Sequence, residues 1–355
     1  RQLPRVEPFY AVKCNPHPAV VNALAFQWLQ RGGGGFDCAS IAEIDLVAAA
    51  VGDEHAGDRV VFANPCKQTS AVLHARAKGV RRLVFDNASE LNKLAELFPD
   101  AELLLRVQTD DSLAQCPLSN KFGAATESCE ALLEHARALG LRVVGVSFHV
   151  GSGCSQRGAF RGALRRARAV FDEAERQGFA MTLLDIGGGF PGADAAGQAT
   201  FADHAADINE MLEELFPSPD LRVIAEPGRF FAAAAQAMLV GVISVAESSA
   251  GDRYYLNDGV YGAFNCLLYD HAAVPQPRIL RGGRELGELE AGPPAPCTLF
   301  GPTCDGFDKI SDAMPLPKLR PGDWLLFPEM GAYTSAAATM FNGLPPAAHF
   351  VYDCR

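Results

Sequence analysis

The sequence predicts an α/β protein, with a (β/α)8 TIM-type barrel over residues 1–238 and a mostly β C-terminal domain over residues 239–355. Eight short apolar segments alternate with stretches of helical pattern, and nearly every apolar segment ends at a polar residue. Near residue 240 the helical pattern fades. A chain of 355 residues is long enough for a large barrel and a second domain.

The eight apolar segments are short and continuous, as expected for parallel strands that are buried on both faces. In chain order they are residues 9–12, 36–39, 60–64, 82–86, 102–106, 143–150, 183–187 and 222–226. Helices are expected between them. The first runs from about Pro18 to Leu29, and the second begins at Ile41 after a capping box formed by Ser40 and Glu43.

Polar residues stand at or near the carboxyl ends of these segments, where a barrel of this type carries its active site. They are Lys13, Asp37, Asn64, Asp86, Arg106, His149 and Glu226, together with the glycines that follow Asp185. Because nearly every strand ends in this way, a functional site is expected at the carboxyl-terminal end of the barrel.

The residues beyond about 240 are rich in Pro and Gly and contain short β-like runs such as Tyr254–Leu256 and Trp324–Phe327. They predict a mostly β second domain. The apolar run from Phe230 to Ala246 is interrupted by Gln236 and is too short to span a membrane, so a helix followed by a strand is expected there.

Composition excludes some classes of function. The formal net charge is -11 and the basic residues form no stripe, so nucleic acid is not an expected partner. Ten cysteines are scattered without CxxC pairs or zinc-like spacing, and no signal peptide is recognisable after Arg1. Reduced cysteines, a cytoplasmic location and no metal site are therefore expected.

Lys13 closes a buried-looking strand, where an ammonium group is costly unless something uses it. It could extend to solvent from the strand end. It could instead be an amine of lowered pKa that forms a Schiff base. This stretch alone leaves both interpretations open.

Two glycine-containing turns could hold a phosphate. Gly187, Gly188 and Gly189 follow the seventh strand, where backbone N–H groups can approach an anion, although a tight turn explains such a triplet equally well. Gly228 and Arg229 follow the eighth strand and could complete the site through backbone and guanidinium groups, or form a structural loop.

His149 ends the sixth strand and could be a core histidine or could stack on a flat cofactor ring, with Ser152 turned to a phosphate. Glu226 could keep a pyridine nitrogen protonated. Together with a Schiff-base lysine and a phosphate cradle, these groups meet the requirements of pyridoxal 5'-phosphate. In the second domain, Asp270 and Asp305 are turn residues or a pair that would suit a distal ammonium on a substrate, and Tyr333 lies in a further polar stretch.

The chain resembles the eukaryotic ornithine decarboxylases, in the fold-type III group of pyridoxal phosphate enzymes with alanine racemase-like architecture. The resemblance covers nearly the whole chain. It is carried, in matching order, by PFYAVKCN, FDCAS, VVFANPCK, SFHVGSGC, LDIGGGFPG, AEPGRFF, NDGVYGAFNCLLYDH, FGPTCDGFD and PEMGAYT.

The resemblance implies a role for each matching residue. Lys13 looks like the lysine that binds the cofactor, Glu226 would pair with its pyridine nitrogen, and His149 would stack on its ring. The phosphate would be held by Ser152, Gly188, Gly189, Gly228, Arg229 and Tyr333. The residues that match the inner pocket are Asp37, Glu43 and Arg106.

The resemblance also implies a homodimer with shared sites. Cys304 and Asp305 would come from the partner subunit, with Cys304 controlling protonation of the product carbon and Asp305 joining Asp270 on the substrate ammonium. Tyr261 would lie at the same interface, and Lys121 with Asp308 would bridge the subunits. Antizyme is a further partner that this family suggests.

The expected activity is decarboxylation of L-ornithine to putrescine and CO2. A decarboxylase of lysine or a related basic amino acid is the first alternative, because one methylene supplies only about 1–3 kcal/mol of discrimination. A non-catalytic regulator of the antizyme-inhibitor kind is the second. Residues 26–35 look like an insertion that could displace Asp37 or loop out, and the second domain is expected to lack an N-terminal contribution.

Overall fold

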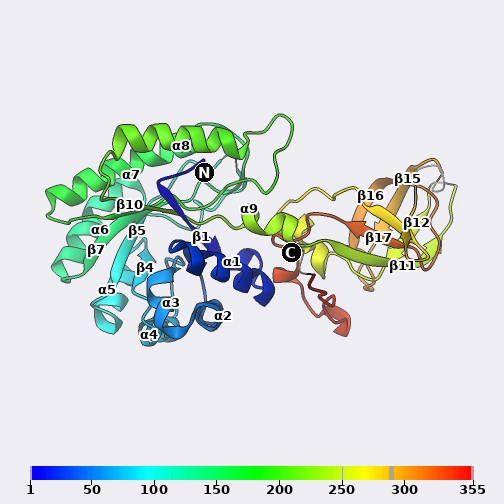
Figure 1. The fold of residues 1–355 in the computed structure, drawn as a ribbon, viewed down its shortest axis with the longest axis horizontal. Coiled ribbons are helices and arrows are strands. Elements are labelled where there is room, and N and C mark those ends of the chain that lie inside the picture. The colour runs from blue at the N-terminus through cyan, green and yellow to red at the C-terminus, as the bar shows by residue number, and fades with distance from the viewer. Residues whose placement is uncertain (1, 113, 250, 288–291, 353–355) are drawn as a thin grey trace. The chain divides into compact units, whose positions relative to one another are not determined.

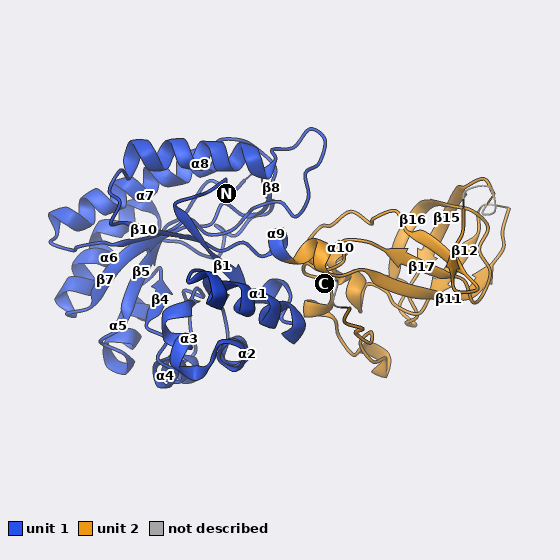
Figure 2. Ribbon diagram, viewed as in Figure 1, with its two compact units in different colours: residues 1–231 blue, residues 232–355 orange. Residues whose placement is uncertain are grey.

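The computed structural model describes residues 2–112, 114–249, 251–287 and 292–352. The chain divides into two compact units, residues 1–231 and 232–355, which are coloured separately in Figure 2. The boundary expected between residues 238 and 239 falls at the start of strand β11 (Met238–Ala246), inside the second unit.

The described residues of the first unit form a closed barrel of eight strands, in the order β1-β10-β9-β7-β5-β4-β3-β2 (Figure 1). The strands are β1 (Val6–Ala11), β2 (Gly35–Cys38), β3 (Val60–Phe62), β4 (Arg82–Phe85), β5 (Glu102–Arg106), β7 (Arg142–Ser147), β9 (Leu183–Asp185) and β10 (Arg222–Ala225). All neighbouring pairs are parallel. Each strand overlaps one predicted apolar segment, so the barrel prediction is confirmed.

Helices connect the strands along the chain (Figure 1). They are α1 (Pro18–Arg31), α2 (Ile41–Val51), α3 (Asp53–Arg59), α4 (Thr69–Ala77), α5 (Ala88–Leu97), α6 (Thr126–Ala138), α7 (Ala159–Arg176), α8 (Phe201–Leu215) and the short α9 (Arg229–Ala232). A 3-10 turn, η1 (Val12–Cys14), follows β1. A separate two-stranded sheet is formed by β6 (Ala114–Cys116), which comes between β5 and β7 in the chain, and β8 (Ser152–Cys154), which comes between β7 and β9.

The segment expected to be an insertion continues helix α1 to Arg31. Trp28 on this extension packs against Phe36 with ring centroids 4.9 Å apart, so the extension is anchored to the start of β2. Asp37 keeps its place in β2, between buried neighbours. Of the two alternatives, displacement of Asp37 or a loop, the structure shows neither.

The predicted capping box at α2 is only half correct. The Ser40 hydroxyl accepts a hydrogen bond from the Glu43 amide, as a capping box requires. The Glu43 carboxylate, however, accepts from the Ala39 amide at 2.6 Å and not from that of Ser40. The Glu43 side chain is therefore turned toward the residues that follow Asp37, which lines the barrel mouth.

Side chains fill the barrel in layers. An apolar layer crosses the middle and consists of Phe9, Val61, Ala63, Val84, Leu104, Leu183 and Ile224. Two positions earlier on four of these strands the inward residues are charged, because side chains alternate along a strand. Arg222 contacts Glu7 at 2.7 Å and Arg82 contacts Glu102 at 3.6 Å. A layer of ion pairs thus closes the amino-terminal end, and the polar strand ends lie at the other.

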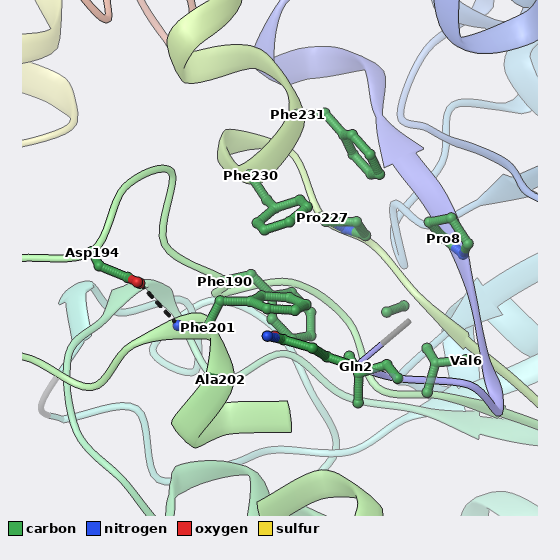
Figure 3. A pocket seen from close by; sticks show the side chains of 12 residues that line it. Gln2, Val6, Pro8, Phe190, Asp194, Phe201, Ala202, Pro227, Phe230 and Phe231 are labelled. Carbon is green, nitrogen blue, oxygen red and sulfur yellow. Dashed lines mark hydrogen bonds between the residues drawn. The ribbon is translucent and has the colours of Figure 1, made fainter. Parts of the chain in front are cut away.

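A cavity of about 580 Å³ lies on the outer side of the strand wall formed by β1 and β10. Pro8 and Ala225 line it, and they alternate with Phe9 and Ile224 of the inner layer. Figure 3 shows aromatic rings, among them Phe230, around this space. The cavity is therefore outside the barrel and apart from its interior.

Helix α8 buries a histidine that supplies a test of acid stability. His204 is fully buried, its Nε2 lies 3.2 Å from the Cys154 carbonyl oxygen, and its Nδ1 is buried without a hydrogen-bond partner. Burial lowers the pKa of His204 below its ordinary value of 6.5, against the smaller opposing effects of the Cys154 carbonyl, Asp207 and Asp203. The neutral ring is thus favoured in the folded chain.

His204 is expected to weaken the fold as the pH falls. Because its pKa is lower folded than unfolded, its contribution is fully present above about pH 6.5 and is lost below it, by at most about 1.4 kcal/mol per pH unit. Thermal unfolding of the wild type and of His204→Gln should therefore differ most at pH 5.5 relative to pH 7.5, with the wild type losing more. Equal losses in both proteins would contradict the assignment.

The described part of the second unit contains a seven-stranded sheet in the order β14-β13-β17-β11-β12-β15-β16. The remaining strands are β12 (Arg253–Leu256), β13 (Arg278–Arg281), β14 (Arg284–Glu285), β15 (Ala295–Phe300), β16 (Lys309–Leu316) and β17 (Trp324–Phe327). The short helices are η2 (Ala233–Ala235), η3 (Ala263–Asn265), α10 (Cys266–Tyr269), η4 (Ser335–Ala337) and η5 (Phe341–Gly343). The prediction of a mostly β second domain is confirmed.

The run from Phe230 to Ala246 forms short helical turns followed by strand β11, as expected. Among the described ranges, no helix combines the length and the apolar character needed to cross a membrane. In the same ranges, no group of three or more His, Cys, Asp or Glu side chains is arranged to hold a metal ion.

Candidate active site

The Lys13 ammonium meets a carboxylate at the mouth of the barrel. Lys13 lies in η1 directly after β1, and Asp37 lies in the neighbouring strand β2. The Nζ atom of Lys13 donates to Oδ2 of Asp37, whose side chain is fully buried, while the Lys13 side chain is 42% exposed. The other oxygen of Asp37 is buried without a hydrogen-bond partner. The amine is therefore accessible from the mouth while its base is fixed.

Two further carboxyl groups are buried beside this pair. Glu226 follows β10, is 6% exposed, and has one oxygen, Oε1, without a hydrogen-bond partner. Burial, together with Asp185 and Asp37, raises the pKa of Glu226 well above its ordinary value. Burial also raises the pKa of Asp185 to about 6. Asp37, Asp185 and Glu226 therefore lie close enough for their charges to interact, and a further positive charge would stabilise them.

His149 lies just beyond β7 and is neutral. Burial lowers its pKa well below the ordinary value, and the positive charges of Arg106 and Lys13 lower it further. Its Nδ1 accepts a hydrogen bond from the Gly151 amide at 3.0 Å, which fixes the ring. A fixed, uncharged imidazole is suited to packing against a flat ring.

The glycine triplet after β9 has no room for side chains. Gly187 and Gly189 have positive φ values of 62° and 107°. A Cβ at Gly188 would lie 2.8 Å from Nε2 of His149, and one at Gly189 would lie 2.7 Å from the Gly151 carbonyl oxygen. The triplet therefore brings backbone close to His149, which favours the cradle over a plain turn.

Two side chains that the sequence assigned to a phosphate lie together. The Arg229 guanidinium donates to the Ser152 hydroxyl at 3.1 Å, although the two residues are 77 positions apart. Gly228 directly precedes Arg229, and its carbonyl oxygen accepts from the Phe231 amide. A cation and a hydroxyl side by side can hold an anionic oxygen.

Arg106 ends β5 and lies over the Phe122 ring, 5.2 Å from its centroid. Lys121 lies 5.0 Å from the same centroid. The ring therefore stabilises two cations at once and fixes the Arg106 guanidinium near His149.

The loop that carries Cys304 belongs to the second unit. Cys304 is exposed. The Tyr261 hydroxyl donates to Asp305, and the Phe307 amide donates to the other Asp305 oxygen at 3.0 Å. These bonds lower the pKa of Asp305, so its carboxylate is charged. The structure thus brings Tyr261 and Asp305 together next to Cys304.

Asp308 organises this loop, which sequence reasoning did not foresee. It is 1% exposed, and its two oxygens accept from the Val260 and Thr303 amides, each at 2.9 Å. It therefore ties the Tyr261 segment to the Cys304 segment. The expected bridge from Asp308 to Lys121 of a second subunit stays a prediction.

Asp270 and Tyr333 also lie in the second unit. Asp270 follows α10 and is buried, with 6% exposure. Tyr333 has a positive φ of 55°, and the next residue, Thr334, donates to the Met330 carbonyl oxygen. Their expected roles toward substrate and phosphate stay predictions, because those roles depend on a site shared with the barrel mouth.

The segment Thr339–Gly343 is a second feature that sequence reasoning missed. Phe341 stacks on Tyr261 with ring centroids 4.3 Å apart, and the Asn342 side chain accepts from the Cys304 amide at 3.2 Å. The available signal was the Asn342-Gly343 pair, because Asn-Gly favours positive φ values and tight turns.

Comparisons with known proteins agree with this geometry. The family described as "Pyridoxal-dependent decarboxylase, pyridoxal binding domain" matches residues 1–233. A Panagrellus redivivus protein named ornithine decarboxylase is 46% identical over 372 residues, covering 99% of this chain and 82% of its own. A Xenopus laevis protein named antizyme inhibitor 2 is 47% identical, covering 97% of this chain and 75% of its own.

Among solved structures, the arginine decarboxylase of Paramecium bursaria Chlorella virus is 34% identical and superposes with a TM-score of 0.90. The match covers 99% of this chain and 90% of that structure. The fold and the comparisons identify the class as barrel enzymes that depend on pyridoxal phosphate. This chain belongs to the pyridoxal-dependent decarboxylase family.

The residues at the barrel mouth fit pyridoxal phosphate. Lys13 offers an accessible amine, and the orphan oxygen of Glu226 is buried where a protonated ring nitrogen would supply the missing charge. The glycine triplet and the Arg229–Ser152 pair offer a phosphate cradle. The cofactor expected from sequence therefore agrees with both the family and the geometry.

Proposed function

We propose that this protein is a pyridoxal phosphate-dependent decarboxylase that converts L-ornithine to putrescine and CO2. The observation that carries the proposal is the Lys13 amine, which is accessible at the barrel mouth and surrounded by the buried carboxyls of Asp37, Glu226 and Asp185. The relative named ornithine decarboxylase, similar along 99% of this chain, supports the choice of substrate.

Each residue of the barrel site has one part in this function. Bound pyridoxal phosphate would supply an electron sink for the bond that breaks. Lys13 would hold it through Nζ, Glu226 would hold a proton at the ring nitrogen, and the neutral His149 ring would pack against its face. The phosphate would be held by Ser152, Gly188, Gly189, Gly228, Arg229 and Tyr333.

Two groups complete the inner pocket. Asp37 would orient the Lys13 amine, with which it is already paired. Burial keeps His149 uncharged, and the positive charge of Arg106, which is held over Phe122, would add to this effect. A charged imidazole would repel a protonated ring, so this positive field favours the stack.

Groups of the second unit would bind the substrate, with Cys304 and Asp305 coming from the partner subunit. We propose a homodimer with shared sites, in which Cys304 of one subunit donates a proton to the carbon that has lost its carboxylate. Asp305, held charged by hydrogen bonds from the Phe307 amide and the Tyr261 hydroxyl, and the buried Asp270 would bind the terminal ammonium of ornithine. The acidic pair has the sign that a diamino acid requires and the wrong sign for a second carboxylate.

The proposed function also includes a cellular location and a regulator. The nine described cysteines are present as thiols, which supports a cytoplasmic location. Antizyme is the proposed regulator, because one relative is named antizyme inhibitor 2. That relative also supports the alternative of a non-catalytic regulator, and the virus arginine decarboxylase supports a different basic substrate.

A substrate panel separates these alternatives. Purified protein with added pyridoxal phosphate is given ornithine, lysine or arginine, and both CO2 and the amine product are measured. We expect the highest kcat/KM for ornithine. For Asp305→Asn, kcat/KM should fall about 10- to 100-fold, because a desolvated ion pair to the ammonium is lost.

Other outcomes of the substrate panel would change the function that we assign to this protein. Preference for lysine or arginine would replace ornithine as the substrate. Binding of the cofactor without turnover of any of the three would favour the regulator. An Asp305→Asn variant with unchanged kcat/KM would remove that residue from the substrate site. Asp312→Asn, an exposed carboxylate on β16, is the matched control.

A further inference from the structure

The turn formed by residues 339–343, here called the C-terminal turn, contacts both segments of the second unit that carry proposed active-site groups. The Thr339 amide donates to the Tyr261 carbonyl oxygen at 2.8 Å, and the Thr339 hydroxyl donates to the same oxygen at 3.0 Å. Asn342 accepts from the Cys304 amide at 3.2 Å. One short turn thus ties together residues from two distant parts of the chain.

The backbone of the C-terminal turn is shaped to present Asn342. Asn342 has a φ of 57° and ψ of 15°, in the left-handed region that Asn tolerates better than most residues. Phe341 is stacked on Tyr261 with an interplanar angle of 25°, which anchors the turn. Asn342 is therefore held in place independently of its bond to Cys304.

The Cys304 thiol depends on its backbone for its position. Cys304 is exposed, so packing does little to fix the side chain. The flanking residues are held from within the loop, because the Thr303 amide donates to Asp308 and the Asp305 amide donates to the Thr303 hydroxyl. The Cys304 amide itself is bound by a side chain 38 residues later in the chain.

We propose that Asn342 is a positioning residue that aims the Cys304 thiol by binding its backbone amide. The inference rests on the proposed function, since it concerns the residue that delivers the proton. Asn342 need not touch substrate or cofactor. An error of about 1 Å in the placement of a reacting group can cost on the order of 100-fold in rate, so one hydrogen bond at this position is sufficient to matter.

Two variants of the 355-residue chain separate the hydrogen bond from the backbone conformation. Asn342→Gly keeps the positive φ but loses the acceptor. Asn342→Asp keeps an acceptor and a side chain that tolerates positive φ. If the bond positions Cys304, only the glycine variant should be impaired.

The first measurement is amide hydrogen exchange in peptides that span residues 301–308. Asn342→Gly should raise the exchange rate of the Cys304 amide by at least about 10-fold, because its acceptor is gone, and Asn342→Asp should leave it near the wild-type rate. This readout does not require turnover. Unchanged exchange in Asn342→Gly would overturn the proposal.

The second measurement is the division of the effect between kcat and KM with ornithine. We expect Asn342→Gly to lower kcat about 10- to 100-fold with KM changed less than about twofold, and Asn342→Asp to restore kcat. Faster exchange with an unchanged kcat would show that the bond holds the loop without serving the reaction, and would also overturn the proposal.

The two measurements separate failure of the inference from failure of the proposed function. If the wild type turns over none of the three basic amino acids, the function is wrong, and the proposal that Asn342 aims a proton donor falls with it. Exchange would then still show whether Asn342 binds the Cys304 amide. If the wild type is active, exchange and kcat together decide the role of Asn342.

Discussion

Lys13→Ala is expected to abolish decarboxylation, lowering kcat by at least about 1,000-fold, because no other described amine has the same access and the same carboxylate partner. Lys67 is the other lysine that we considered for binding the cofactor, because it too pairs with a buried carboxylate. Its ammonium is fully buried, donates to the carbonyl oxygens of Asn64 and Val84, and pairs with Glu90. An amine bound in this way serves the fold, not a cofactor.

The measurement is an absorbance titration with pyridoxal phosphate, followed by an ornithine assay. The wild type should show the band of lysine-bound pyridoxal near about 420 nm, and Lys13→Ala should not. Lys318→Ala, at an exposed ion pair with Glu247, is the matched control and should behave as the wild type. A normal band and normal turnover in Lys13→Ala would exclude this lysine.

The same variant tests the shared site. Lys13→Ala and Cys304→Ala should each be inactive. When the two are mixed and allowed to exchange subunits, activity should return to about a quarter of the wild-type value, because half of the dimers are mixed and each mixed dimer has one intact site. No recovery would place Lys13 and Cys304 in the same subunit's site, or would mean that the subunits do not exchange.

Glu226→Gln is expected to lower kcat on the order of 100- to 1,000-fold, the range seen when one preorganised electrostatic partner is lost. A neutral amide cannot hold the proton at the ring nitrogen as a carboxylate does. The remaining carboxyls, Asp185 and Asp37, keep the site acidic, so cofactor binding should weaken less than turnover. Full activity in Glu226→Gln would remove it from this role.

In the cofactor-free protein, Glu226→Gln should raise the stability of the fold, although it lowers kcat in the presence of the cofactor. The pKa of Glu226 is raised in the folded chain, so its contribution is present below about pH 4.5 and is lost as the pH rises through the folded value. At pH 7.5 the cofactor-free Glu226→Gln should therefore unfold at a higher temperature than the cofactor-free wild type. With pyridoxal phosphate bound, the wild type should recover more stability than the variant.

Most of the barrel could be predicted from sequence because its strands are buried on both faces and stand out as apolar runs. The strand ends were less certain: the predicted sixth and seventh strands ran past Ser147 and Asp185, where the chain leaves the sheet. Phe148, Val150 and Ile186 extended the apolar pattern because they are buried in the loops that follow these strands. Burial, which the pattern reports, does not by itself distinguish strand from loop.

The sequence correctly placed Lys13, Asp37 and Glu226 together at the carboxyl ends of the strands, while their roles stay predictions. Individual side-chain contacts were predicted less well, both within one turn and between distant residues. The Glu43 carboxylate binds the Ala39 amide and not that of Ser40. Asn342 reaches Cys304 across 38 residues, and nothing in the local pattern indicates that contact.

Ion pairs at the base of the barrel determine the route by which substrate and products enter and leave. They join Arg222 to Glu7 and Arg82 to Glu102. Together with the apolar layer above them, they fill the described barrel interior at the end opposite Lys13. Whatever enters past Lys13 must return by the same route. Substrate, amine product and carbon dioxide would then all pass through the same opening, so the product must leave before the next substrate binds.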